Sequence, residues 1–280
     1  MKQRIITALI LAPLAVLAIF ELPLPLFLLV VTGITVLALW EWAQFVGSQS
    51  RYLAMIPTLT CLVISYWTIP SDVVSLNQLT FSHMALLIVA STWWLIASAL
   101  AITYPKSTGF WQHSKVLRQL FGVLTVLPFF WSLLILRAQN IELEPYHGAK
   151  LVLFVCLLVW AADSGAYFAG KAFGKRKMAP NVSPNKTIEG LVGGIVVALM
   201  VGGVTANIFD IHFSSVASMI IITLVTVIIS VLGDLVESMF KRVSGIKDSS
   251  NIIPGHGGVL DRIDSLTAAF PVFTLLYFTI

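Results

Sequence analysis

The sequence predicts an all-α membrane protein, with about nine transmembrane helices in one integral membrane domain that covers residues 1–280. Of the 280 residues, 58% are hydrophobic and only 11% are charged, and the mean hydropathy is +0.93. Soluble domains do not reach these values. The hydrophobic residues form runs of roughly 17 to 25, long enough to cross a bilayer core as helices, and the charges fall mostly between the runs.

Nine apolar runs follow one another along the chain. We expect spans near 5–22, 25–46, 52–70, 83–104, 119–136, 150–173, 190–209, 215–240 and 261–280. The basic start MKQR precedes the first run, but no small-residue cleavage site follows, so this run is expected to be an uncleaved helix. Cys61 and Cys156 lie inside apolar runs without the spacing of a metal site or a disulfide framework, and both are expected to be core residues.

Basic residues are distributed unevenly between the two ends of the predicted helices. One end collects Lys2, Arg4, Arg51, Lys106, Lys115, Arg118, Lys175, Arg176, Lys177, Lys186, Lys241, Arg242 and Lys247, and the other has only Arg137 and Lys150. The positive-inside rule then predicts a cytoplasmic amino terminus and cytoplasmic loops at 174–190 and 241–260, in a bacterial inner membrane. An odd number of spans places the carboxyl terminus outside. No basic patch alternates with aromatic residues, so nucleic-acid binding is not predicted.

Several carboxylates lie inside spans or at their ends, where each costs about 2.5–3.5 kcal/mol on insertion scales and needs a partner or a wet cavity. Asp234, Glu237, Ser238 and Lys241 follow the spacing i, i+3, i+4, i+7 and share one helix face; Asp261, Asp264 and Ser265 repeat that spacing in the last span; Asp163, Tyr167 and Lys171 line a stripe of the sixth. A basic loop with Gly255, Gly257 and Gly258 joins the first two faces.

These residue types fit a nucleoside triphosphate with a divalent cation. Magnesium prefers carboxylates and phosphate oxygens, lysine and arginine bind the remaining phosphate charge, and glycine lets backbone amides approach an anion closely. The loop is therefore predicted to cradle phosphate. Because these residues all lie in 151–280, this part is expected to hold the catalytic helices and loops. Hydropathy alone does not define a role for the helices of residues 1–150.

The same residues resemble a known family. Ser238, Lys241, Arg242, Lys247, Asp248, Pro254, His256, Gly257, Gly258, Asp261, Arg262 and Asp264 reproduce the pattern S-x-x-K-R-x4-K-D-x5-P-x-H-G-G-x-x-D-R-x-D of phosphatidate cytidylyltransferases, or CDP-diacylglycerol synthases. The upstream segments DSGAYFAGKAFGKRK and SPNKTIEG are similar to other polar segments of that family. Over the first 150 residues the resemblance is weak.

The resemblance implies transfer of CMP from CTP to phosphatidic acid, which yields CDP-diacylglycerol and pyrophosphate. It implies magnesium, and we leave room for a second cation. The lipid phosphate is itself the nucleophile, so the enzyme has to align the substrates and neutralise charge at the α-phosphorus. The expected partners are CTP, phosphatidic acid and the lipid bilayer.

Roles can be carried over residue by residue. The expected metal ligands are Asp234, Glu237, Asp261 and Asp264; the expected catalytic and phosphate-binding residues are Lys241, Arg242, Lys247, Asp248, His256 and Arg262; and the expected nucleotide pocket comprises Ser183, Asn185, Lys186, Thr187, Ser238, Gly257 and Gly258. Alternatives stay open for several of them. Lysines at a helix end also serve as topology anchors, His256 also fits a loop brace, and Asp248 also fits an ion-pair partner of Lys247 or Arg242. Thr187 to Glu189 also fits a helix cap.

Two other function classes remain. A CTP-dependent polyprenol kinase shares similar nucleotide loops but attacks a different phosphorus and releases CDP, not pyrophosphate. A secondary transporter also has acids inside helices, but typically has broken helices at the bilayer midplane. The oligomeric state is not fixed by the sequence, and a homodimer is compatible with it.

Overall fold

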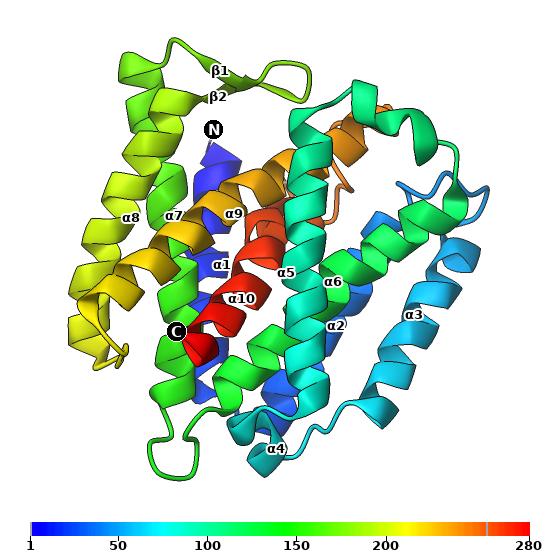
Figure 1. Ribbon diagram of the computed structural model, residues 1–280. Helices are drawn as coiled ribbons and strands as arrows, with labels where there is room; N and C mark the ends of the chain where they lie inside the picture. The colour runs from blue at the N-terminus through cyan, green and yellow to red at the C-terminus, as the bar shows by residue number, and fades with distance from the viewer. Residues whose placement is uncertain (1, 256) are drawn as a thin grey trace.

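The computed structural model describes residues 2–255 and 257–280, and within them it is almost entirely helical (Figure 1). Each of the nine expected spans corresponds to one long helix, which confirms the all-α fold class. These helices are α1 (Lys2–Glu21), α2 (Leu24–Trp42), α3 (Arg51–Thr68), α5 (Phe81–Ile102), α6 (Lys115–Ala138), α7 (His147–Phe173), α8 (Ile188–Phe209), α9 (Val216–Val243) and α10 (Leu260–Thr279).

Six of these helices are long and apolar enough to cross a membrane, namely α2, α5, α6, α7, α8 and α9. The chain is therefore an integral membrane protein, while the count of nine spans stays a prediction. The last helix, α10, carries Asp261, Arg262 and Asp264 in its first two turns, which lowers its apolar content.

Four short elements were not expected from hydropathy. They are α4 (Val73–Gln78), the 3-10 helix η1 (Lys106–Phe110), and the antiparallel strands β1 (Lys177–Ala179) and β2 (Ser183–Thr187). Hydropathy runs reveal only long apolar segments, so short polar elements escape them. The hairpin places β2 directly before α8.

Helix starts follow ordinary capping chemistry. The side chains of Ser50, Ser114, Thr187 and Ser215 each accept a hydrogen bond from the backbone amide three residues later, which satisfies an amide that has no partner within the helix. The helix α9 continues three residues past its predicted end at 240, so Lys241 and Arg242 lie in its last turn.

The helices α7 and α8 approach each other closely through glycines. A Cβ added to Gly194 would lie 2.6 Å from the carbonyl oxygen of Ala162, and one added to Gly165 would lie 2.9 Å from the carbonyl oxygen of Gly193. Small residues at helix contacts are the usual device for close packing in membranes. The pair α7–α8 therefore forms a tight unit that carries the hairpin at one end.

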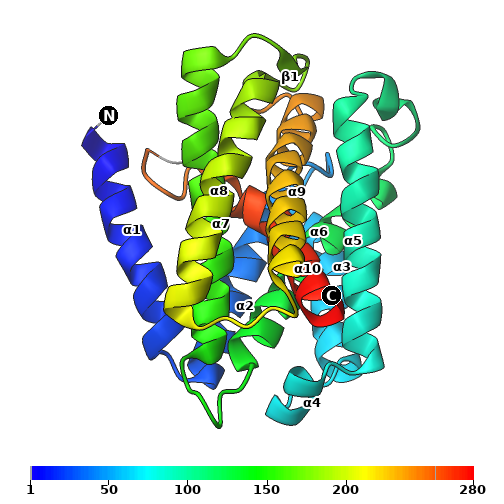
Figure 2. The same ribbon diagram turned by 60° about the vertical axis from the view of Figure 1, so that its left-hand side comes forward.

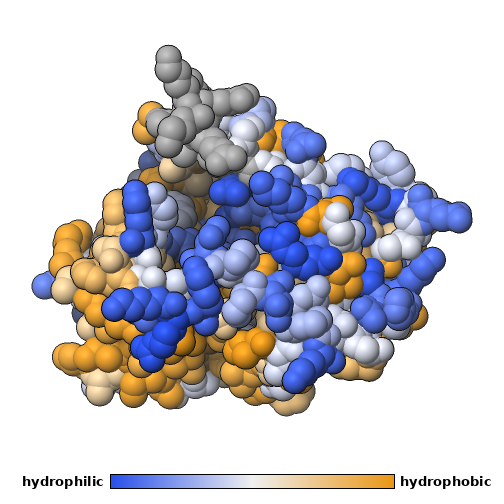
Figure 3. Space-filling view, turned by 90° about the horizontal axis from the view of Figure 1, so that it is seen from above, coloured by the Kyte–Doolittle hydropathy of each residue, from blue (hydrophilic) through white to orange (hydrophobic). Residues whose placement is uncertain are grey.

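One continuous hydrophobic core contains residues of both 1–150 and 151–280. The helix α10 lies at its centre and packs against α9, α6, α5, α7 and α2. Figures 1 and 2 place the amino terminus, the hairpin and the C-terminal end of α9 at the same end of the molecule, and α4 at the opposite end. Seen from the first end, polar residues gather across the middle and apolar residues lie mostly toward the left and lower edges (Figure 3).

Candidate active site

The acidic faces of α9 and α10 meet as predicted, and Lys241 joins them. Its Nζ lies 2.7 Å from Oε2 of Glu237 and 2.6 Å from Oδ1 of Asp261. The Lys241 side chain is only 12% exposed, and those of Glu237 and Asp261 are 4% and 3% exposed. Sequence analysis expected Lys241 to hold a substrate phosphate or anchor the helix, whereas here it neutralises two buried carboxylates.

Asp261 organises the loop between α9 and α10. Besides Lys241, its carboxylate accepts hydrogen bonds from the backbone amides of Ser249, at 3.1 and 3.0 Å, and Gly258, at 2.7 Å. A carboxylate offers about four lone-pair positions, and these contacts occupy nearly all of them. Asp261 thus braces the loop, and its expected role as a metal ligand stays a prediction.

Gly257 and Gly258 are glycines because the loop is tightly packed. Gly257 has φ +84°, a backbone conformation that favours glycine, and a side chain on Gly258 would collide with Ser249. The Gly258 amide already donates to Asp261. The sequence predicted that this amide would donate to a bound anion. In the structure it donates to the carboxylate of Asp261.

A first pocket with several polar side chains lies between the hairpin, α7, α8 and α9, and we call it the hairpin pocket. It encloses about 250 Å³. Its lining is Asp163, Ala166, Tyr167, Met178, Asn185, Lys186, Thr187, Gly190, Leu191, Val231 and Asp234. Lys186 Nζ lies 2.6 Å from Oδ2 of Asp234, and Ser238 Oγ donates to the other oxygen of Asp234 at 3.3 Å. The pocket thus gathers one lysine and two acids.

A second polar pocket lies in the loop between α9 and α10, and we call it the loop pocket. It encloses about 570 Å³. Its lining is Lys247, Asp248, Asn251, Ile253, Gly255, Gly257 and Arg262. Lys247 and Arg262 are exposed at its walls, as expected for cations that bind phosphate. The ion pairs among the described residues do not include Asp248, so its expected pairing with Lys247 or Arg242 is absent there.

Several predicted residues lie outside both pockets. The Arg242 guanidinium donates through Nε to the carbonyl of Val182 at 3.1 Å and so holds the hairpin turn. Ser183 begins β2 without lining either pocket. Thr187 does line the hairpin pocket, and it also caps α8 by accepting from the Gly190 amide at 3.1 Å, which confirms the capping alternative for this residue. His256 lies outside the described residues.

The sequence analysis missed Glu41, a fully buried carboxylate near the end of α2. It accepts hydrogen bonds from the loop that lines the loop pocket and from the start of α10. The signal was present: Glu41 is the one acid within the apolar run 25–46, and the insertion cost applied to Asp234 applies to it equally.

The acidic residues of α9 and α10 suit a divalent cation, although they do not form a ready-made cage. Among the described residues, no three His, Cys, Asp or Glu side chains lie close enough to hold one metal ion. However, Glu237 Oε1 is buried without a hydrogen-bond partner, and Asp264 lies near enough to Asp234 and Glu237 for their charges to interact. Mg²⁺ is usually held by one or two carboxylates together with substrate phosphates, and this arrangement fits.

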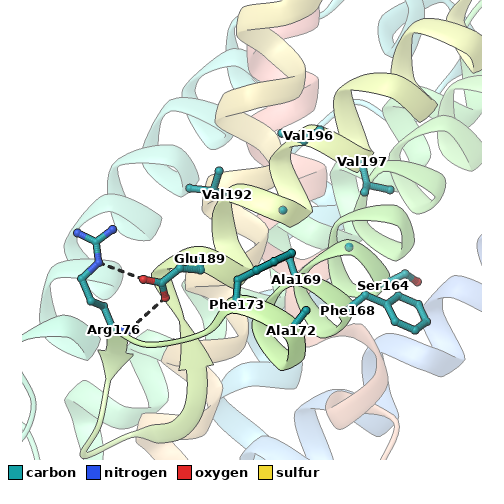
Figure 4. A pocket seen from close by; sticks show the side chains of 12 residues that line it. Ser164, Phe168, Ala169, Ala172, Phe173, Arg176, Glu189, Val192, Val196 and Val197 are labelled. Carbon is teal, nitrogen blue, oxygen red and sulfur yellow. Dashed lines mark hydrogen bonds and ion pairs between the residues drawn. The ribbon is translucent and has the colours of Figure 1, made fainter.

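A third, apolar pocket lies apart from these acids. It is a groove of about 880 Å³ between α7 and α8, lined by Phe168, Ala169, Val192, Val196 and further small or apolar residues (Figure 4). At one end, Arg176 Nε lies 3.1 Å from Oε1 of Glu189. With these two polar exceptions and Ser164, the lining offers nothing for phosphoryl chemistry.

Comparison with known proteins identifies the family. A model of the cytidylyltransferase family matches residues 2–280. The chain belongs to the cytidylyltransferase family. A phosphatidate cytidylyltransferase of Haemophilus influenzae is 45% identical over 289 residues, covering 99% of each chain. One of Pseudomonas aeruginosa is 42% identical, covering 99% of this chain and 96% of the relative, and one of Bacillus subtilis is 34% identical, covering 99% and 97%.

The match to cytidylyltransferases is not confined to the polar motifs. Each of these three alignments includes the helices of 1–150, for which the sequence analysis found only weak resemblance. The match to the cytidylyltransferase family thus extends over the helices of 1–150, α2 included. It also favours a nucleotidyltransferase over the alternative of a secondary transporter.

Proposed function

We propose that the protein transfers CMP from CTP to phosphatidate and releases pyrophosphate, with CDP-diacylglycerol as the lipid product. The observation that carries this proposal is the similarity to relatives named phosphatidate cytidylyltransferase, at 34–45% identity over nearly the whole chain. The two polar pockets at one end of an integral membrane protein support it, because a soluble nucleotide and a membrane lipid have to meet there.

In this proposal the loop pocket binds the triphosphate. Lys247 and Arg262 supply two exposed cations at its walls, and charge-assisted contacts to phosphate are the stronger class of hydrogen bond. The hairpin pocket, with Lys186 and Asp234, takes the lipid phosphate or the reacting α-phosphate. The lipid phosphate attacks the α-phosphorus in line, the bond from that phosphorus to the bridging oxygen breaks, and pyrophosphate leaves with the electron pair.

Magnesium is the cofactor that these residues suit, and one or two carboxylates among Asp234, Glu237 and Asp264, together with substrate phosphates, would hold it. When bound, it would supply positive charge to the phosphate oxygens. We leave room for a second cation. The chain's own contribution is alignment of two anionic substrates and neutralisation of their charge by the lysines and arginines named above.

For the membrane setting we propose the bacterial inner membrane, with the amino terminus, the hairpin and the loop pocket on the cytoplasmic side. The support is the lysine and arginine excess at that end, where CTP is available. We also propose that a homodimer is compatible with the open face of α7 and α8; the mass of the detergent-solubilised protein would decide between a monomer and a dimer.

The deciding experiment uses purified protein with α-labelled CTP, phosphatidate and Mg²⁺. Cytidylyl transfer predicts label in the lipid and one pyrophosphate released for each lipid product. Release of CDP with an unlabelled lipid product from a polyprenol acceptor would instead establish the kinase.

A pair of lysine variants tests the assignment of the loop pocket. Lys247→Gln should raise KM for CTP by about tenfold or more, while Lys115→Gln, an exposed lysine at the start of α6, should leave it unchanged. An unchanged KM for CTP in Lys247→Gln would remove this lysine from the triphosphate site.

A further inference from the structure

Glu41 binds both ends of the loop between α9 and α10. Its Oε1 accepts from Ser250 Oγ at 2.5 Å and from the Val259 amide at 2.9 Å. Its Oε2 accepts from Ser249 Oγ at 3.0 Å and from the Leu260 amide at 2.5 Å. The side chain is fully buried, and these four groups satisfy it.

The four donors, Ser249, Ser250, Val259 and Leu260, lie at the two ends of the loop that lines the loop pocket, and we call this region the neck. Ser249 and Ser250 directly follow Lys247 and Asp248, which line one wall, while Val259 and Leu260 begin α10 just before Arg262, which lines the other. Asp261 binds the same neck through the amides of Ser249 and Gly258. Two carboxylates, one from α2 and one from α10, therefore close the loop at its base.

The end of α2 is itself firmly held, so Glu41 is a fixed point. The ring of Trp42 packs 4.8 Å from that of Phe240 in α9. The Gln44 amide donates to the carbonyl of Ser249, and Arg51 Nη2 donates to Gln44 Oε1 at 2.6 Å. Side chains that directly follow Glu41 thus tie the end of α2 to α9 and to the same loop.

The chemistry of the contacts requires a carboxylate. Each oxygen of Glu41 faces one backbone amide, of Val259 or Leu260, and backbone amides only donate. A glutamine has one oxygen and one NH2 group, so in either orientation its NH2 would face one of these amides. A buried donor without an acceptor is costly. The substitution would therefore weaken the hydrogen bonds that hold Val259 and Leu260 at the neck of the loop pocket.

We propose that Glu41 is a positioning residue, which sets the shape of the phosphate-binding loop pocket from the N-terminal helices. The proposal rests on the function proposed above, in which this pocket takes the triphosphate of CTP. It gives α2 a role in the reaction without contact to substrate. A purely structural role would lower folding stability and affect both substrates equally, whereas positioning of the loop pocket acts mainly on CTP.

The test compares Glu41→Gln with Glu21→Gln, an exposed acid at the end of α1. Wild-type protein is assayed first, and a wild type that transfers no CMP sinks the proposed function independently of Glu41. With an active wild type, we expect Glu41→Gln to raise KM for CTP by about tenfold or more, with KM for phosphatidate changed less than about threefold. Glu21→Gln should match wild type in both.

A second measurement does not depend on activity. Hydrogen exchange of the purified protein should show faster exchange of residues 249–255 in Glu41→Gln than in wild type, with α5 and α6 unchanged. Ser250→Ala, which removes one hydroxyl partner only, should change exchange and KM in the same direction and less. Equal KM changes for both substrates, faster exchange throughout the protein, or wild-type values in folded Glu41→Gln would each overturn the positioning role.

Discussion

Replacing Lys241 by methionine tests the charge balance between α9 and α10. Methionine keeps much of the apolar stem but removes the ammonium group, which among the described residues is the only cation paired with Glu237 or Asp261. Breaking a buried ion pair by removing one partner typically costs about 3–5 kcal/mol. Asp261 keeps its backbone donors, whereas Glu237 keeps none, so we expect a loss of about 3 kcal/mol in the free energy of unfolding, mostly from Glu237.

The measurement is a denaturant titration of the detergent-solubilised protein, with the exposed lysine variant Lys171→Met as control. Because Glu237 carries most of the penalty, adding Glu237→Gln to Lys241→Met should restore roughly 1–3 kcal/mol, the cost of one unsatisfied buried group. A loss below about 1 kcal/mol in Lys241→Met, or no recovery in the double variant, would refute the charge-balance reasoning. A fall in CTP affinity at unchanged stability would return Lys241 to the phosphate-binding residues.

Three further outcomes are expected. Asp234→Asn, which nearly keeps the side-chain volume, should insert and fold normally but lose at least about 100-fold in turnover across a Mg²⁺ titration; near-normal turnover would remove it from the site. Gly258→Ala should lower the free energy of unfolding by about 1–3 kcal/mol because a methyl group there collides with neighbouring side chains, whereas Gly203→Ala, with nothing within 4 Å, should not; equal stabilities would contradict the packing. Single cysteines at Lys247 and Glu142, with the native cysteines replaced, should be labelled from opposite sides of the membrane; labelling from one side would refute the topology.

The long helices were predictable because bilayer thickness fixes their length and composition, so hydropathy alone marks them. The shared face of Asp234 and Glu237 was predictable for the same kind of reason, since helical period fixes which residues meet. The antiparallel hairpin was not, because β1 and β2 have only three and five residues and contact helices that are distant or separate elements, β1 with α5 and β2 with α8.

The contacts that decide each polar residue's role were beyond sequence pattern, because they join segments far apart in the chain. Glu41 and Leu260 are 219 positions apart, and no periodicity relates them. Lys241 shows the same limit within the motif: its spacing predicts that it shares a face with Glu237, but only the approach of α10 turns it from a free cation into the partner of two buried acids.

The charges between the two polar pockets suggest why a divalent cation suits this site. The acids are Asp163, Asp234, Glu237, Asp261 and Asp264, and the cations that pair or interact with them are Lys186, Lys241 and Arg262. With all groups ionised, five negative charges face three positive ones, which leaves two negative charges. One Mg²⁺ would balance them, and without it two anionic substrates would have to approach a negative site. In the proposed function, a divalent cation would thus serve charge balance before chemistry, because repulsion between unscreened charges in a partly buried site is far stronger than in water.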